Sequence, residues 1–372
     1  MAGLSEKILV ALSGGVDSAV SAALLVDQGH EVEAIYVRTW EHENDLLGDC
    51  PGAKDLKDAK RIAEHLGIPF QVLNLVDFYR REVVQPMIRG YASGTTPNPD
   101  ILCNRNMKFG TLLDFAMRQG FDALATGHYC RRLIGCDGNA QLWEGMDKTK
   151  DQSYFLARLS RDQLEKVRFP LGEITKLEVR KLALKWNLHV ANKKDSQGIC
   201  FLGKVKIPDF LSNFIDDNPG EIVTKNGQVL GQHRGLHKYT LGQRRGIGIP
   251  SNQDHENYVV TGKNEDRNQL IVAFEHPSES TLWSRRFRVE SLSFLNFDTP
   301  LEPIRVLGRA RYRDPSTKLE LIPQMNENAE IFFDLPQRAL TPGQILALYE
   351  GERLIGSAYY SKSAFGRASL SA

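Results

Sequence analysis

The chain of 372 residues has few cysteines, almost no net charge and no long apolar run. Its five cysteines are odd in number and widely spaced, which is not the framework of a secreted protein, so any disulfide is expected to be transient and catalytic. With 47 basic and 46 acidic side chains, any nucleic-acid surface must be local. No stretch approaches the roughly 18 apolar residues that cross a membrane, and the first strand begins too early to leave room for a leader. We therefore expect a cytoplasmic protein without a membrane partner, with a monomer as the default.

A glycine-rich loop follows the first apolar run. Residues 13–18 read Ser-Gly-Gly-Val-Asp-Ser and come directly after Lys7–Leu12, which we predict to be a short buried strand. Apolar residues then recur at helical spacing up to Gly29, so the loop leads from a strand into a helix. Backbone N–H groups at such a place bind anions, and we expect a pyrophosphate group there. The loop matches neither the Walker pattern nor the dinucleotide pattern, and the alternative is a plain glycine turn that closes a βα unit.

Strand-like and helical stretches alternate through the first half of the chain. We predict strands at 31–37, 70–75 and 122–126, helices at 54–66, 78–89 and 109–119, and a further helix opened by a capping box at 175–178. This alternation predicts an α/β fold with a doubly wound parallel sheet, whose ligand lies beyond the carboxyl ends of the strands. Glycine-rich short strands begin near Pro208, and alternating strands with a hairpin at 350–352 suggest a final small barrel or sandwich. The expected domains are 1–207, 208–283 and 284–372.

Two cysteines stand in contexts that resemble loops. Cys103 follows two prolines, and Asp100 stands three residues before the thiol. Cys200 follows Lys-Lys-Asp-Ser-Gln-Gly-Ile, whose lysines would favour a thiolate. The alternative for each is an inert buried thiol, because the proximity of two distant cysteines cannot be deduced from their spacing.

The other cysteines and one histidine receive weaker assignments. Cys130 and Cys136 are too few for a zinc site, since no second ligand pair accompanies them, and we interpret both as bystanders. Cys50 is also interpreted as non-catalytic, although an exposed thiol there stays open. His128 either orients a group beside the nucleotide or is a satisfied turn histidine.

Ordered motifs along the chain carry a family resemblance. They lie at residues 13–18, 98–104, 126–129, 150–155, 195–201, 231–244, 309–312 and 337–344. Together they resemble the bacterial tRNA-specific 2-thiouridylases, enzymes with an ATP-pyrophosphatase loop, over nearly the full chain. Two positions depart from the family pattern: Val37 stands where methionine is frequent, and residues 356–360 replace a more glycine-rich ending.

The resemblance implies a reaction. ATP, with Mg²⁺, adenylates the C2 oxygen of the wobble uridine at position 34 of a tRNA and releases pyrophosphate to the loop. Cys200 corresponds to the cysteine that carries sulfur as a persulfide, and Cys103 to the nucleophile and disulfide partner. The implied partners are the tRNAs for lysine, glutamate and glutamine and a persulfide donor, such as a cysteine desulfurase or a sulfur-relay protein. No tightly bound cofactor is expected.

The resemblance also implies site residues in an ATP-pyrophosphatase catalytic domain, followed by a central domain and a β-barrel that contacts tRNA. The ATP-binding positions are Ala11, Leu12, Ser13, Gly14, Gly15, Val16, Asp17, Ser18, Val37 and Gly127, with Asp17 as the Mg²⁺ carboxylate. The positions for the target base and the tRNA are Asn98, Pro99, Asp100, Lys150, Asp151, Gln152, Arg311 and Tyr312. Asp100 is a candidate acid/base or base-orienting group, and an Asx turn after Pro99 is the alternative.

Two stretches suggest an RNA surface without reference to any family. Residues 231–246 and 305–313 each contain four Lys or Arg residues, at least one tyrosine and no acid. Guanidinium groups beside aromatic rings suit phosphate contacts and base stacking, and the alternative is a solvated basic surface. Two other functions stay open: an ATP-pyrophosphatase ligase that acts on a small metabolite, and a non-catalytic tRNA-binding protein.

Overall fold

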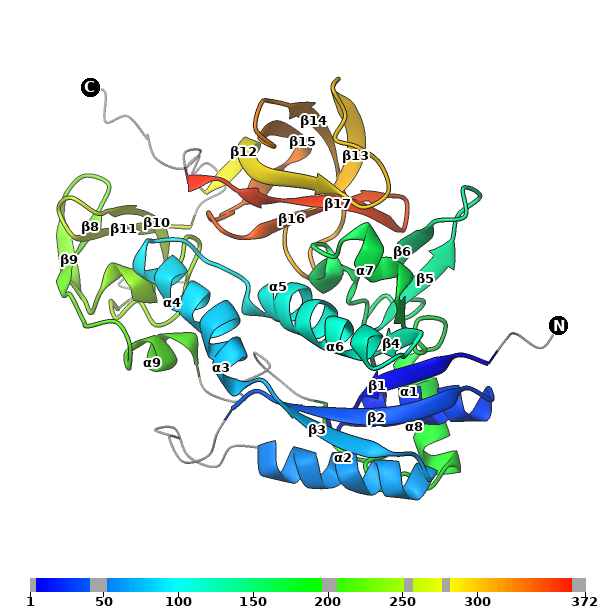
Figure 1. Cartoon of the computed structure of the whole chain (residues 1–372). Coiled ribbons are helices and arrows are strands. Elements are labelled where there is room, and N and C mark those ends of the chain that lie inside the picture. The colour runs from blue at the N-terminus through cyan, green and yellow to red at the C-terminus, as the bar shows by residue number, and fades with distance from the viewer. Residues whose placement is uncertain (1–4, 41–51, 196–205, 251–256, 276–281, 363–372) are drawn as a thin grey trace.

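The computed structural model describes residues 5–40, 52–195, 206–250, 257–275 and 282–362. Figure 1 shows an α/β part with the N-terminus, a small β-rich part and a β-barrel near the C-terminus. The predicted fold class is confirmed, while the boundaries at residues 207 and 283 stay predictions. No helix within these ranges is long and apolar enough to span a membrane.

The α/β part is built on a parallel sheet in the order β3-β2-β1-β4-β7. Its strands are β1 (Lys7–Ala11), β2 (Glu31–Arg38), β3 (Phe70–Asn74), β4 (Ala123–Ala125) and β7 (Val167–Arg168). The chain runs outward from β1 to β3 and then returns to β4 on the other side of β1. The end of β1 is therefore the topological switch point at which such sheets bind ligands.

Helices cover both faces of this sheet (Figure 1). Ile8 and Val10 pack against α1 (Val16–Asp27), α2 (Gly52–Leu66) and α8 (Lys176–Lys185), while Leu9 packs on the opposite side. This alternation follows from the two-residue period of a strand, and it explains why a continuous apolar run forms β1. The capping box predicted for α8 is present, because Thr175 and Glu178 cap each other's backbone N–H groups.

The helices on the second face are longer than predicted. One runs through α3 (Val76–Tyr79), a π-helical segment η2 (Arg80–Val84) and α4 (Gln85–Ala92). The next runs through α5 (Pro99–Leu102), a π-helical segment η3 (Cys103–Leu112) and α6 (Leu113–Arg118). Short helices complete the described helical segments: η4 (Ser153–Leu156), α7 (Arg161–Glu165), α9 (Ile207–Leu211) and η5 (Leu236–Lys238).

The central part has a small mixed sheet in the order β10-β11-β8-β9. Its strands are β8 (Gly220–Thr224), β9 (Val229–His233), β10 (Tyr258–Asn264) and β11 (Gln269–Phe274). Buried side chains such as Ile222, Val260 and Leu270 form its own core. A separate core is what allows such a short segment to behave as a domain.

The C-terminal strands close into a barrel. They are β12 (Trp283–Phe294), β13 (Ile304–Arg309), β14 (Thr317–Pro323), β15 (Ala329–Arg338), β16 (Ile345–Glu350) and β17 (Arg353–Tyr360). Closure comes from antiparallel pairing of β12 with β17, in which Val289 stands opposite Tyr360. The hairpin of β5 (Cys130–Ile134) and β6 (Ala140–Glu144) extends the same sheet, because Leu142 pairs with Leu354 of β17.

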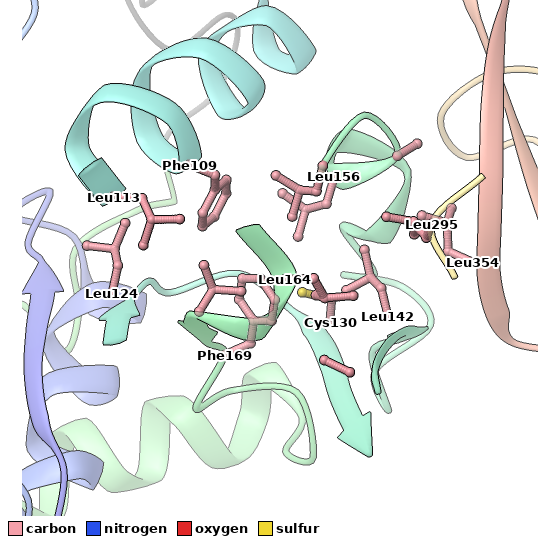
Figure 2. Packing of buried hydrophobic residues seen from close by; sticks show 14 of the residues in the cluster. Phe109, Leu113, Leu124, Cys130, Leu142, Leu156, Leu164, Phe169, Leu295 and Leu354 are labelled. Atoms are coloured by element: carbon pink, nitrogen blue, oxygen red, sulfur yellow. The ribbon is translucent and has the colours of Figure 1, made fainter. Parts of the chain in front are cut away.

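One hydrophobic cluster joins the α/β part to the barrel (Figure 2). Phe109 and Leu124 belong to the α/β part, and Leu295 and Leu354 to the barrel region. Continuous apolar packing of this kind favours a fixed relation between the two parts rather than free domain motion.

Candidate nucleotide site

The loop after β1 has the shape of an anion site. Gly14 has φ of +73°, and a Cβ atom there would lie 2.3 Å from the backbone oxygen of Asp55, so only glycine fits. The Oγ atoms of Ser13 and Ser18 lie 3.1 Å apart, and the Ser18 hydroxyl also approaches the Gly15 oxygen at 3.1 Å. Among the residues that the structure describes, no side chain caps the first N–H groups of α1. These groups are therefore available to an anionic ligand at the switch point.

A second loop approaches this one closely. A Cβ atom on Gly127 would lie 2.8 Å from the backbone nitrogen of Ser18, which explains a glycine at this predicted nucleotide position. Its neighbour His128 is buried, and its Nδ1 atom forms a hydrogen bond with the Thr126 hydroxyl at 2.7 Å. Burial and the charge of Lys108 hold the pKa of His128 well below its usual range. This geometry favours the structural interpretation of His128.

The carboxylate of Asp17 already binds a cation. Lys176 Nζ lies 2.6 and 2.8 Å from its two oxygens, and the Tyr129 hydroxyl donates to it at 2.7 Å. Burial and the charge of Asp17 raise the pKa of Tyr129 well above its usual range, so this phenol stays a donor. The sequence assigns Lys176 and Tyr129 no role, because nothing in their spacing shows that they meet Asp17.

Asp195 forms the centre of an ion-pair network beside Asp17. Lys150, Lys176 and Arg180 reach its carboxylate at 2.7–2.8 Å. Burial opposes ionisation of Asp195, but the hydrogen bonds from Lys150 and Lys176 outweigh it and lower the pKa to about 2. The carboxylate is therefore ionised at neutral pH and holds two lysines at the edge of the phosphate loop.

A further lysine holds the loop from its other side. Lys193 Nζ donates to the Gly14 oxygen at 2.9 Å and to Asp55 and Asp58 at 2.7 and 2.6 Å. Burial lowers the pKa of Lys193, but these partners outweigh it and the net pKa is raised. The ammonium group thus ties the phosphate loop to α2.

A pocket of about 260 Å³ opens at this network. Its lining comprises Ser13, Gly15, Val16, Asp17, Asp55, Tyr129, Lys150, Gln152, Lys193, Lys194, Asp195, Tyr312 and Arg313. Residues predicted for ATP and residues predicted for tRNA therefore share one cavity, and the barrel contributes Tyr312 and Arg313 to it. Ala11 and Val37 are half-buried, and Leu12 is buried with its N–H bonded to Ile35 at 2.9 Å, so these three flank the loop without lining this pocket.

Cys103 lies in a helix, and its predicted loop context is wrong. The Asn98 side chain accepts hydrogen bonds from the N–H groups of Asp100 and Ile101, and Pro99 takes the first helical position. Asn followed by Pro is a helix start, a signal that a prediction of two loop prolines overlooks. The Cys103 side chain is only 1% exposed. Asp100 stands in the first turn of this helix. The side chain that caps the local backbone is that of Asn98, and not that of Asp100 as the alternative of an Asx turn after Pro99 would require.

The other cysteines divide into described and undescribed ones. Cys200 and Cys50 lie outside the described residues. Cys130 is fully buried in the shared cluster (Figure 2), where burial raises the pKa of its thiol well above the usual range. Cys136, in contrast, is exposed. Across the described part of the chain no three His, Cys, Asp or Glu side chains are grouped as a metal site.

The residues predicted for tRNA have different environments. Lys150 and Gln152 line the pocket, and the ring of Tyr312 lies 4.2 Å from that of Phe155. Arg311 pairs with Asp314 at 2.8 Å and is half-buried. Asp151, in contrast, is buried and accepts hydrogen bonds from Gly145, Ser153 and Arg309 at 2.7–3.1 Å. Its carboxylate faces the protein interior and would have to leave these bonds to touch RNA.

The two basic stretches are largely neutralised by acids from elsewhere in the chain. Lys238 pairs with Asp217, Arg244 with Glu275, Arg305 with Asp334, and Arg309 with Glu144 and Asp151. A stretch without acids is therefore not a free basic patch, because the fold brings distant carboxylates to it.

Comparison with known proteins places this geometry in a class of HUP-domain proteins. Residues 6–204 match a family described as "tRNA methyl transferase HUP domain", residues 208–274 a "tRNA methyl transferase PRC-barrel domain", and residues 284–359 an "Aminomethyltransferase beta-barrel domain". Proteins of this class have a HUP domain followed by two β-rich domains, which agrees with the parallel sheet and the two further sheets of this chain.

Curated relatives identify the family within this class. Relatives named tRNA-specific 2-thiouridylase MnmA are 47% identical in Akkermansia muciniphila, over 95% of this chain and 98% of theirs, and 42% identical in Pseudomonas fluorescens Pf0-1, over 94% and 93%. One from Shouchella clausii is 41% identical over 96% of both chains. The chain belongs to this family of enzymes, the tRNA-specific 2-thiouridylases.

Proposed function

We propose that this protein is an ATP-dependent tRNA-uridine 2-sulfurtransferase that modifies the wobble uridine. The observation that carries the proposal is the shared pocket, in which Asp17 and the phosphate loop face Lys150, Gln152 and Tyr312. A site that brings a triphosphate and an RNA base together suits adenylation of that base. The 4-residue α5 places Asn98 and Asp100 at a helix start, where they would position the target uridine.

The first step activates the uridine. The C2 oxygen attacks the α-phosphorus of ATP, a new oxygen–phosphorus bond forms, and the bond to the β-phosphate oxygen breaks. The electron pair of that bond leaves with pyrophosphate, whose charge the loop N–H groups and Lys176 would bind. The AMP group then makes the C2 oxygen a good leaving group.

Mg²⁺ fits beside Asp17, because the carboxylate already attracts the ammonium group of Lys176. No three acidic, histidine or cysteine side chains are grouped for a metal within the described ranges, so ATP phosphates would supply most ligands. When bound, the ion would neutralise phosphate charge. Asp17 would then hold the ion on the loop side of the pocket.

The second step transfers sulfur. The terminal sulfur of a Cys200 persulfide attacks C2, and AMP leaves with the electron pair of its bond to C2. The Cys103 thiolate then attacks the Cys200 sulfur, the sulfur–sulfur bond breaks, and its electron pair stays on the sulfur of 2-thiouridine. The resulting Cys103–Cys200 disulfide needs two electrons from an external thiol before the next turnover.

The test is reconstitution with purified protein. ATP, Mg²⁺, a persulfide donor and unmodified tRNA for lysine, glutamate or glutamine should yield 2-thiouridine by mass spectrometry. Cys103→Ser and Cys200→Ser should each abolish product, while Cys136→Ser, at an exposed thiol, serves as the matched control. Absence of 2-thiouridine with competent tRNA would refute the proposal.

The same assay separates the two alternatives. A ligase acting on a small metabolite would form AMP without tRNA, and a non-catalytic binding protein would bind tRNA without releasing pyrophosphate. We also propose that the protein acts as a cytoplasmic monomer that receives sulfur from a cysteine desulfurase or a relay protein. Sedimentation of the purified chain tests the monomer.

A further inference from the structure

The cations around the pocket are not equivalent. Lys150 and Lys193 pair with carboxylates at 2.6–2.8 Å. Two exposed cations of the same lining, Lys194 and Arg313, have neither a side-chain hydrogen bond nor an ion pair among the residues described. Of these two, the one that comes from the barrel is Arg313. Its guanidinium lies 5.4 Å from the centre of the Tyr312 ring. Unlike Lys150 and Lys193, Arg313 can therefore bind an incoming anion without leaving a carboxylate.

Arg313 comes from a different domain than the phosphate loop. It stands in the connection between β13 and β14 of the barrel, which lies above the α/β part in Figure 1. The ring of Tyr312 packs on Phe155 at 4.2 Å, and Arg311 and Asp314 pair at 2.8 Å. The connection is therefore held in place on both sides of Arg313.

The backbone of Arg313 also departs from the ordinary. Its φ is +71°, in the left-handed region that favours glycine. An arginine there costs backbone free energy that a glycine would avoid, and such costs cluster at functional positions. The strained backbone at Arg313 is explained if an arginine side chain is required at this point of the pocket lining.

We propose that Arg313 is a phosphate-binding residue that the barrel contributes to the nucleotide pocket. It binds the ATP phosphates opposite the loop and stabilises the charge that pyrophosphate gains as the bond between the α-phosphorus and the bridging oxygen breaks. A guanidinium group suits this role because it donates two parallel hydrogen bonds to phosphate oxygens. This inference rests on the proposed function, since it uses the same ATP.

The test compares Arg313→Ala and Arg313→Gly with Arg285→Ala, an exposed barrel arginine that does not line the pocket. Binding of an ATP analogue with a non-cleavable α,β bond is measured by calorimetry without tRNA, and tRNA binding is measured without nucleotide. Both Arg313 variants should bind the analogue roughly 10- to 100-fold more weakly, as expected for a lost charged hydrogen bond. Arg285→Ala should match the wild type.

The glycine variant separates function from folding. Arg313→Gly removes the strain at φ of +71°, so its urea midpoint should equal or exceed that of the wild type while analogue binding falls. If the wild type makes 2-thiouridine and the Arg313 variants bind the analogue as tightly as the wild type does, this inference alone is overturned. Loss of tRNA affinity with unchanged analogue affinity would also overturn it, because the phosphate would then be that of RNA. A wild type that binds no nucleotide would overturn both this inference and the proposed function.

Discussion

Replacing Arg309 should weaken the junction between the barrel and the α/β part. Arg309 ends β13, and its guanidinium pairs with Asp151 at 2.7 Å and with Glu144 at 2.5 Å. The side chain of Arg309 is 13% exposed, that of Asp151 4% and that of Glu144 10%. The guanidinium also lies 4.8 Å from the centre of the Tyr349 ring. Arg309→Met therefore leaves the buried Asp151 carboxylate without its cation, and Glu144 with Lys148 alone at 2.9 Å.

The expected magnitude follows from that burial. Removing one partner of a buried ion pair costs about 3–5 kcal/mol, because the remaining charge stays desolvated. This is a large part of the roughly 5–15 kcal/mol that stabilises a domain. The triple variant Arg309→Met, Glu144→Gln, Asp151→Asn leaves no unpaired charge, so it should lose clearly less than the single variant.

Urea unfolding, followed by tryptophan fluorescence, measures both variants against the wild type. Because the chain has several domains, the first transition is compared rather than a single global free energy. A loss below about 1 kcal/mol for Arg309→Met would show that water already screens the network, the usual result for surface pairs. A triple variant as unstable as the single one would refute the desolvation argument.

Three other perturbations test the site. Gly127→Ala should weaken binding of an ATP analogue at least about tenfold, because its Cβ would lie 2.9 Å from the carbonyl carbon of Asp17; calorimetry giving wild-type affinity would contradict this. The pKa of Asp195 is lowered from 3.8 to about 2, so the stability that its carboxylate contributes is present above pH about 4 and is lost as the pH falls toward 2. The difference in urea midpoint between the wild type and Asp195→Asn should therefore shrink from pH 7 to pH 3. A difference that stays constant would contradict this prediction. Arg311→Ala, which frees Asp314, should weaken tRNA binding and lower the slope of its salt dependence by about 1 while ATP binding stays intact; unchanged tRNA affinity across a salt series would reject the contact.

Local signals allowed much of the α/β part to be predicted. The apolar run of β1, the glycine loop and the capping box of α8 each depend on residues close together in sequence, and all are present. The helix at Asn98–Pro99 was missed although its signal is equally local, because prolines were interpreted as loop markers rather than as a first helical residue. The burial of Cys103 follows from that helix.

Long-range pairings could not be predicted in this way. The β5–β6 hairpin joins the barrel sheet through β17, more than two hundred residues later in the chain, and Asp17 meets Lys176 through folding alone. Such contacts depend on the packing of whole elements rather than on spacing. This is why the sequence indicated the phosphate loop but not the lysine beside its carboxylate.

The arginines of residues 305–313 show how charge and structure must be combined. Three of the four serve other residues of the chain: Arg305 pairs with Asp334, Arg309 with buried carboxylates, and Arg311 with Asp314. Arg313 alone among them lacks an ion pair within the described part of the chain, and it lines the pocket. In a chain of net charge +1, many basic groups pair with carboxylates of the chain itself, so a ligand is attracted by the cations that folding leaves uncommitted. The position of Arg313 is therefore more informative than the basic composition of the stretch in which it stands.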